Sequence, residues 1–198
     1  MRPRRFNYTL SALSVSGYVS AATGAGPFTT IAGSPADGLG HQVTLASTAD
    51  LHLINMTITG LDAEGRSQTE VIAGPNNNTV TSTKYFKSIS SVSAASTLGA
   101  NTMNIGWNAV IVTPVFVVNS YATYGPSMSV GLTGTCTFTL QQTLDNPFEQ
   151  NPATFITLGT ASQTGSYGAF CSPAVAGLRV SIASHTSGVI AVSFAVGE

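Results

Sequence analysis

The stretch MTITGLDAEGRSQTEVIAG, residues 56–74, has the pattern of a β-hairpin. Its first part alternates apolar and polar residues up to Gly60, as a half-buried strand does. Asp62 to Gly65 supply the connection, because Asp bonds neighbouring backbone amides and Gly accepts a positive φ. The return strand runs from Arg66 to Ala73. The stretch therefore predicts two antiparallel strands joined by a short turn.

The same alternation recurs in HQVTLAS (41–47), TCTFTLQQ (135–142), LRVSIAS (178–184) and VIAVSFAV (189–196). No apolar stripe of helical period competes with it, and Ser, Thr and Gly interrupt the alanine-rich pieces. We predict an all-β protein of two small antiparallel β-sandwich domains, jelly-roll or immunoglobulin-like in strand order.

The predicted domain junction lies near Pro114. Proline has no amide hydrogen for a ladder bond, so it fits the first residue of a strand or a linker. We place an N-terminal β domain with a basic arm at residues 1–110 and a C-terminal β-sandwich domain at residues 111–198.

The composition limits the classes of partner. Charged residues make up 8% of the 198 residues, against roughly a quarter in an ordinary soluble domain. With a net charge of -1 and scattered basic residues, we expect no nucleic-acid partner. No apolar run is long enough to cross a bilayer, and polar residues interrupt the segment after the first arginines. We therefore expect neither a membrane partner nor an export signal.

The few charges are unevenly placed. Many fall within residues 59–92, where we expect them on turns and on an exposed strand edge that Lys84 and Lys87 protect from unwanted pairing. From Ser88 to Leu144 there is no Asp, Glu, Lys or Arg. A surface of Ser, Thr, Tyr and Ala can pack against another protein without removing water from an ion. This run suits an assembly subunit, and a monomer with a hydroxyl-rich surface fits the composition equally well.

The sequence holds no recognisable catalytic or metal-binding motif. His41, His52 and His185 lack the spacing of a zinc site. Asp145 and Glu149 could form a carboxylate pair, but they lie in a proline-containing loop that does not establish a cleft. No Gly-x-Ser-x-Gly elbow or phosphate-binding loop is present. We expect no enzymatic activity, no cofactor and no metal.

Cys136 and Cys171 are the two cysteines, and each lies among small or apolar residues. We expect buried free thiols, because a protein made in the cytosol usually keeps such cysteines reduced. A disulfide stays open if their two strands prove to be adjacent.

Four runs of the sequence resemble a family of small virion structural proteins of tailed bacteriophages. They are ITGLDAEGRSQTEVIAGPNNNTVTSTKYFKSISSVSA (58–94), LGANTMNIGWN (98–108), VGLTGTCTFTLQQTLDNPFEQNPATFITL (130–158) and AGLRVSIASHTSGVIAVSFAVGE (176–198). The shared features are a D-x-x-G turn, an E-x-I-x-GP strand end, a YFKSI strand, an NPF segment and a closing strand. They are turn and strand features rather than a catalytic signature.

The resemblance implies a non-enzymatic β protein of the virion, assembled in the bacterial cytoplasm. Its implied partners are the major capsid protein or other virion subunits, and we expect a homo-oligomer. Decoration or cementing of the capsid is the first expectation. The alternatives are a neck, tail or head-fibre component, or a receptor- or carbohydrate-binding module in which Trp107, Tyr121, Tyr124 and Tyr167 would supply stacking faces.

The N-terminus does not match that family. Arg2, Arg4 and Arg5 beside Phe6 and Tyr8 could form an arm that docks on an acidic neighbouring subunit through paired guanidinium–carboxylate bonds. A frayed, solvated terminus is the alternative.

Overall fold

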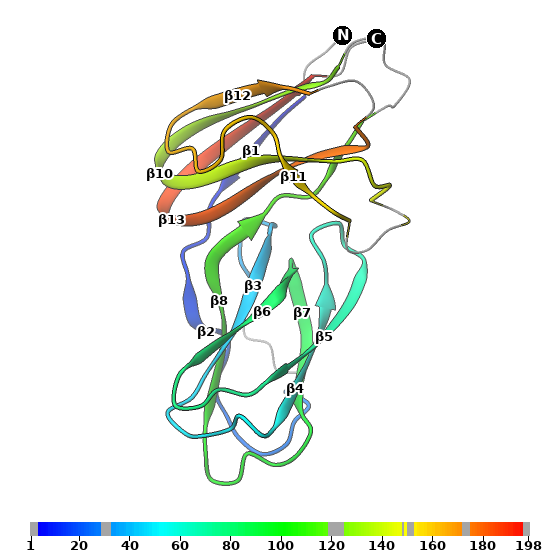
Figure 1. Cartoon of the computed structure of the whole chain (residues 1–198). Coiled ribbons are helices and arrows are strands. Elements are labelled where there is room, and N and C mark those ends of the chain that lie inside the picture. The colour runs from blue at the N-terminus through cyan, green and yellow to red at the C-terminus, as the bar shows by residue number, and fades with distance from the viewer. Residues whose placement is uncertain are drawn as a thin grey trace. The chain divides into compact units, whose positions relative to one another are not determined.

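The computed structural model describes residues 4–28, 33–118, 125–147, 149, 153–171 and 175–195. The regular secondary structure of these residues consists of β-strands, and the strands pair antiparallel (Figure 1). The prediction of an all-β antiparallel fold is confirmed. In the part of the chain that is described, no helix has the length and apolar character needed to span a membrane.

The chain divides into two compact units. The middle unit comprises residues 11–111, and the terminal unit comprises residues 1–10 together with 112–198. The junction predicted from the sequence falls after residue 110, with the N-terminal segment in the first domain. In the structure that segment belongs to the other unit, because its strand pairs with a strand near the end of the chain.

That strand is β1 (Arg4–Thr9), and its partner is β13 (Gly177–Ala195). Their register places Phe6 opposite Val192. The Leu10 amide donates to the Gly188 carbonyl at 3.0 Å and so extends the pairing beyond β1. Alternation fixes the face of each residue but not the partner of its strand, which is why this long-range pair was not predicted.

Two antiparallel sheets form the middle unit, which is a β-sandwich. The first has the order β2 (Ser14–Ala22), β8 (Met103–Val112), β3 (Gly40–Ala46) and β6 (Thr79–Phe86). The second has the order β5 (Ser67–Ala73), β4 (Asn55–Leu61) and β7 (Ser88–Ala94). One buried cluster draws on both sheets and includes Tyr18, Val43, Leu45, Met56, Ile58, Phe86, Ile89, Val92 and Ile105.

The hairpin predicted from residues 56–74 is confirmed. β4 and β5 pair in register up to Leu61 and Ser67, and Gly65 in the connection has a φ of 84°. The Asp62 carboxylate accepts the amides of Glu64 and Arg66 at 3.0 and 2.8 Å. Asp62 is only 5% exposed, so the expectation of an exposed charge was wrong here. The carboxylate is enclosed because it replaces backbone partners that the turn lacks.

Glu70 is a second buried charge in this stretch, at 9% exposure. Its carboxylate accepts the amide and hydroxyl of Thr83 at 2.8 and 2.7 Å, and the amide of Lys84 at 2.9 Å. These amides lie where β6 loses its regular register with β3, so the ladder does not satisfy them. Lys84 and Lys87 are exposed, as expected.

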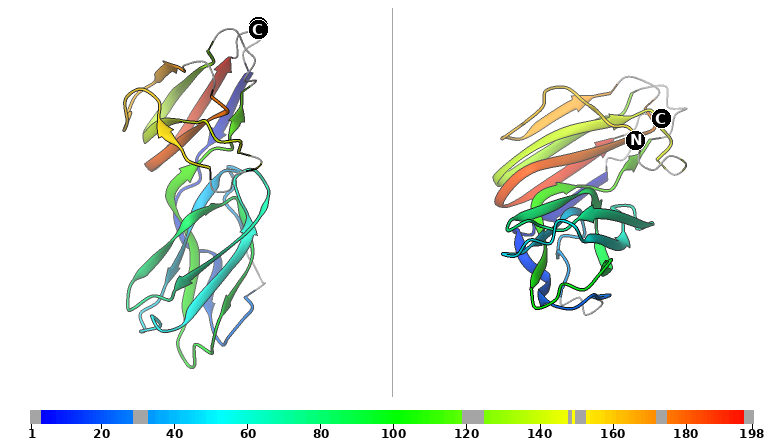
Figure 2. Two further views of the ribbon diagram at one scale, coloured as in Figure 1. Left: turned by 45° about the vertical axis from the view of Figure 1, so that its right-hand side comes forward. Right: turned by 60° about the horizontal axis from the view of Figure 1, so that its bottom comes forward.

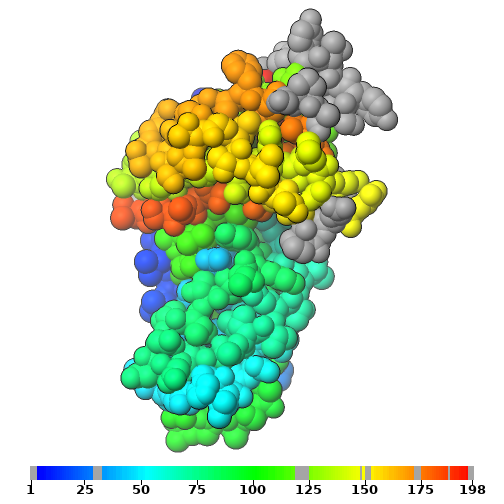
Figure 3. Space-filling model, in the orientation of Figure 1, coloured from blue at the N-terminus to red at the C-terminus, as the bar shows by residue number. Residues whose placement is uncertain are grey.

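The terminal unit is built on a long ribbon of β10 (Ser127–Thr143) and β13, which run side by side in Figure 2. The far edge of β10 pairs with β11 (Ile156–Thr157) and β12 (Tyr167–Phe170), and that of β13 pairs with β1 and β9 (Phe116–Val117). The segment from β11 to β12, yellow to orange in Figure 3, lies at the surface of this unit. The buried side of the ribbon carries Met128, Val130, Phe138, Leu140, Val180, Ile182, Ile190 and Val192.

Candidate functional site

The predicted N-terminal arm is a paired strand over most of its length. Arg2 lies outside the described residues. Phe6 and Tyr8 are half-buried, while Arg4 and Arg5 are exposed on β1. The Phe6 ring packs against Phe116 with ring centroids 5.1 Å apart. The two aromatic residues therefore contribute to the packing of their own unit, and the two described arginines face solvent; their docking on a neighbouring subunit stays a prediction.

One face of the sheet in the terminal unit carries mostly small side chains. Residues that alternate with the buried Met128 and Val130 of β10, and with Val192 of β13, point to this face. The register extends it over β12 and β1. We call it the small-residue face; its members are Phe170, Ser127, Ala195, Gly168, Ser129, Ser193, Arg5, Gly131, Ala191, Asn7, Thr133, Val189 and Thr9.

The small-residue face is open to solvent in this chain. Ser129, Gly131 and Thr133 are exposed along β10. Phe170, at one end of the face, is 85% exposed. Among the members only Arg5 is charged, and it lies on the outermost strand. A partner could therefore cover the centre of this face without removing water from an ion.

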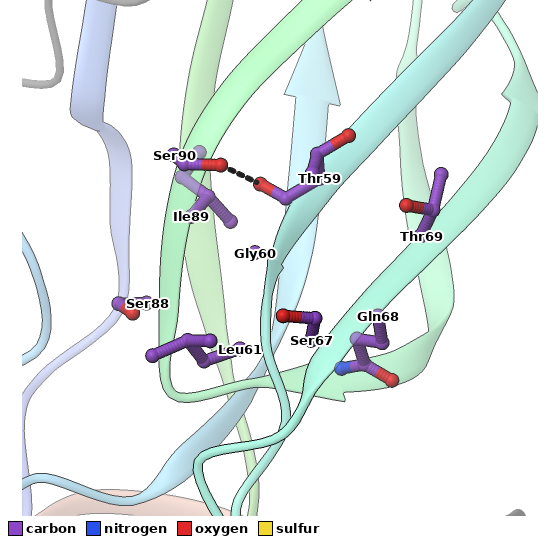
Figure 4. Close-up of a pocket in the computed structure, with 9 residues that line it drawn as sticks. All are labelled: Thr59, Gly60, Leu61, Ser67, Gln68, Thr69, Ser88, Ile89 and Ser90. Atoms are coloured by element: carbon purple, nitrogen blue, oxygen red, sulfur yellow. Dashed lines mark hydrogen bonds between the residues drawn. The ribbon is translucent and has the colours of Figure 1, made fainter.

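A groove of about 480 Å³ opens on the second sheet of the middle unit (Figure 4). It is lined by Thr59, Gly60, Leu61, Ser67, Gln68, Thr69, Ser88, Ile89 and Ser90. The register shifts here, because Thr59 faces Ser91 whereas Gly60 faces Ile89, which leaves Ser90 as an extra residue. The Ser90 hydroxyl donates to the Thr59 carbonyl at 3.1 Å.

The lining of this groove is neutral and holds no aromatic ring. The Gln68 amide group already donates to the Tyr85 carbonyl. Hydroxyl groups without a positioned base are not activated nucleophiles. The groove can offer hydrogen bonds to a neutral group, but it lacks a stacking surface and a base.

His41 and Asp37 form an enclosed pair in the middle unit, with both side chains 0% exposed. The Nε2 atom of His41 lies 3.1 and 3.0 Å from the two Asp37 carboxylate oxygens, and its Nδ1–H donates to the Asn108 carbonyl at 3.1 Å. Burial disfavours ionisation of Asp37, but the hydrogen bond and charge of His41, with the amides of Ser11 and Leu39, lower its pKa overall. Since His41 lies on β3 and Asn108 on β8, the hydrogen bond between them links these two strands.

The other two histidines lie apart from this pair. His52 is in an exposed turn and contacts Asp50. His185 is buried on β13, opposite Cys136 of β10. Within the described residues, no group of three or more His, Cys, Asp and Glu side chains could hold a metal ion.

The carboxylates considered for glycoside hydrolysis lie in the loop after β10. Asp145 accepts the amide of Thr154 at 2.6 Å, and the Glu149 amide donates to the Asn146 carbonyl at 3.1 Å. Asp145 therefore braces its own loop. Glu149 is exposed.

Cys136 and Cys171 are buried free thiols, as predicted. Burial raises the pKa of each thiol to about 11. The Cys171 amide donates to the Pro126 carbonyl just before β10, whereas Cys136 lies ten residues further along that segment (126 to 136). At about 3.3 Å per residue this span far exceeds the roughly 6 Å between the Cα atoms of a disulfide. The two cysteines of one chain therefore cannot pair.

The aromatic residues considered for sugar stacking are partly engaged. Trp107 packs edge-on against Tyr18, with ring centroids 4.9 Å apart, and its Nε1–H donates to the Ala12 carbonyl at 2.9 Å. The Tyr167 hydroxyl accepts the Thr160 amide at 3.1 Å. Tyr121 and Tyr124 lie outside the described residues. Trp107 is thus attached to the core of its unit.

No protein-family model matches the chain, and no curated protein matches it. Among solved structures, the major capsid protein P2 from bacteriophage PM2 is 11% identical over 98% of each chain, with a TM-score of 0.22. A similarity of this size carries no argument about fold or function.

Proposed function

We propose that the chain is a non-enzymatic structural subunit of a bacteriophage virion. The observation that carries this proposal is the small-residue face, an open sheet surface with an exposed phenylalanine and a single charged member. Such a surface is suited to being covered, because charged side chains are depleted at the centres of protein interfaces. The resemblance of the sequence to virion proteins of tailed phages suggests the particle as the assembly.

Covering the small-residue face would cost little desolvation free energy. Its Ser and Thr hydroxyls can hydrogen-bond to a neighbour or keep bridging water. Burial of the Phe170 ring would contribute about 1.5–3 kcal/mol. Arg5 lies on the outermost strand of the face, where a guanidinium can remain hydrated or pair with a carboxylate. Repeated over many copies, modest contacts of this kind sum to firm attachment.

A non-enzymatic role is supported by the burial and the surroundings of the side chains that could act in catalysis. The imidazole of His41 is enclosed with Asp37, and both thiols are buried with raised pKa values. The groove on the middle unit has hydroxyl groups but no base in its lining. These residues have structural explanations that need no substrate.

Within the virion we propose decoration or cementing of the capsid, with a neck, tail or head-fibre position as the second reading. Quantitative gel densitometry of purified virions tests both. A copy number comparable with that of the major capsid protein supports decoration, and a copy number of a few per particle indicates the neck or tail. Absence of the chain from purified virions would refute a virion role.

A further inference from the structure

We infer that the small-residue face is a self-association surface, covered by the same face of a second copy of this chain. The inference rests on the proposed function for the idea that the chain works inside an assembly. Its own basis is the area, the charge and the shape of the face, each of which favours a second copy as the occupant.

The area of the face is sufficient for a specific dimer. Three strands about 4.8 Å apart followed over roughly six residues at about 3.3 Å, with the four residues of β12 beside them, give on the order of 500 Å² once the outer side chains are included. Two copies would then bury about 1,000 Å², the size at which specific interfaces begin. The pairs Phe170–Ser127 and Thr133–Val189 mark the two ends of this area.

The charges favour face-to-face contact between copies. Only Arg5 is charged on the face, and it lies on the outermost strand, so two copies bring neutral centres together. A strongly acidic or basic partner would find a single charge to recognise.

The shape of the face is complementary to itself, which a two-fold interface requires. Phe170 projects from β12 at one end. Further along, Gly168 beside Ser129 and Gly131 beside Ala191 have no side chain, and Ala191 has only a methyl group, so we expect the face to be lower at these three positions, which we call the hollow. A two-fold rotation can place each Phe170 ring over the hollow of the other copy. The aromatic ring then buries its faces on backbone and methyl groups.

Two variants of the full chain test the surface, and one matched variant controls for it. Phe170→Ser removes the projecting ring, and Ser129→Arg places a charge at the exposed centre of the face. Leu53→Ser is the control, because Leu53 is 86% exposed but belongs to the middle unit. Sedimentation velocity over a micromolar-to-millimolar concentration series measures association, and thermal unfolding checks that each variant is folded.

The wild-type chain and Leu53→Ser are expected to dimerise alike. Each face variant should raise the dimer dissociation constant by roughly a hundredfold, since every substitution acts twice in a two-fold interface. A wild-type chain that stays monomeric at the highest concentration overturns the inference, and so does a dimer that folded Ser129→Arg leaves intact. If that monomer is still present on purified virions, the virion role stands and only self-association falls. If the chain dimerises but is absent from purified virions, the proposed function is refuted and the self-association surface is still supported.

Discussion

Gly134 of β10 and Gly188 of β13 face each other across the ribbon of the terminal unit, and both have positive φ angles, 99° and 148°. The adjoining register shift between Thr135 and Cys136 marks a bulge in the same place. Bulges bend a strand and increase its twist. This glycine pair therefore marks the point where two strands of 17 and 19 residues depart from a straight ladder.

Replacement of Gly188 should destabilise the terminal unit. A Cβ atom at this position would lie 2.6 Å from the Thr133 carbonyl oxygen, on a backbone whose φ disfavours any side chain. Gly188→Ala is expected to lower the free energy of unfolding by about 1–3 kcal/mol, measured by chemical denaturation. Gly165→Ala in the same unit is the control, because a Cβ atom at that position would meet no heavy atom within 4 Å. Equal losses for the two variants would argue against strain at Gly188.

The turn carboxylate Asp62 should matter more than its place in a surface loop suggests. Besides two amides, it accepts the Nε–H of Arg66 at 2.8 Å. Asp62→Ala leaves these donors without their partner and should lower the free energy of unfolding by about 2 kcal/mol. Asp62→Asn keeps an acceptor oxygen for the amides and should recover part of that loss. The control is Asp50→Ala, in an exposed turn, whose unfolding midpoint should stay close to wild type; a similar loss there would contradict the argument.

The sequence predicted what depends on neighbouring residues. The hairpin around Asp62 was predictable because its turn chemistry and alternation lie within one short stretch. The pairing of Arg4–Thr9 with β13 was not, since its two strands lie at opposite ends of the chain and alternation carries no partner information. The burial of Glu70 was not predicted for a similar reason. Its hydrogen-bond donors, Thr83 and Lys84, come from an irregular part of another strand.

Only part of the small-residue face could be predicted from the sequence. The absence of charge between Ser88 and Leu144 indicated that neutral surface exists, and alternation along β10 assigns Ser129 and Gly131 to the face opposite Val130. What could not be read was the addition of β12, which brings Phe170 to the same face from a segment some forty residues away (127 to 170). That juxtaposition depends on strand order.

The buried pair of Asp37 and His41 predicts a loss of stability in acid. The folded-state pKa of Asp37 lies below its ordinary value of 3.8, so its ionised form stabilises the fold at pH values above 3.8. This contribution falls as the pH drops through 3.8 and is lost once the pH has passed below the folded-state pKa. We expect Asp37→Asn to be less stable than wild type at neutral pH. Urea unfolding at neutral pH and in acid should show that the free energy of unfolding falls more steeply with acidification for wild type than for this variant. If acid lowers the free energy of unfolding of wild type and Asp37→Asn by the same amount, the acid sensitivity comes from other groups.

The thiols predict a chemical difference between the folded and unfolded chain. Because burial raises the pKa of Cys136 and Cys171 to about 11, both should be almost fully protonated and shielded at mildly alkaline pH. A thiol-specific reagent should therefore modify the native chain slowly and the urea-unfolded chain at both positions, as counted by intact mass. Cys136→Ser and Cys171→Ser each keep one thiol, so the rate measured for each folded variant shows which cysteine accounts for any reaction of the native chain. Rapid native modification at Cys136, in the middle of β10, would show that the ribbon opens there far more readily than its buried position implies.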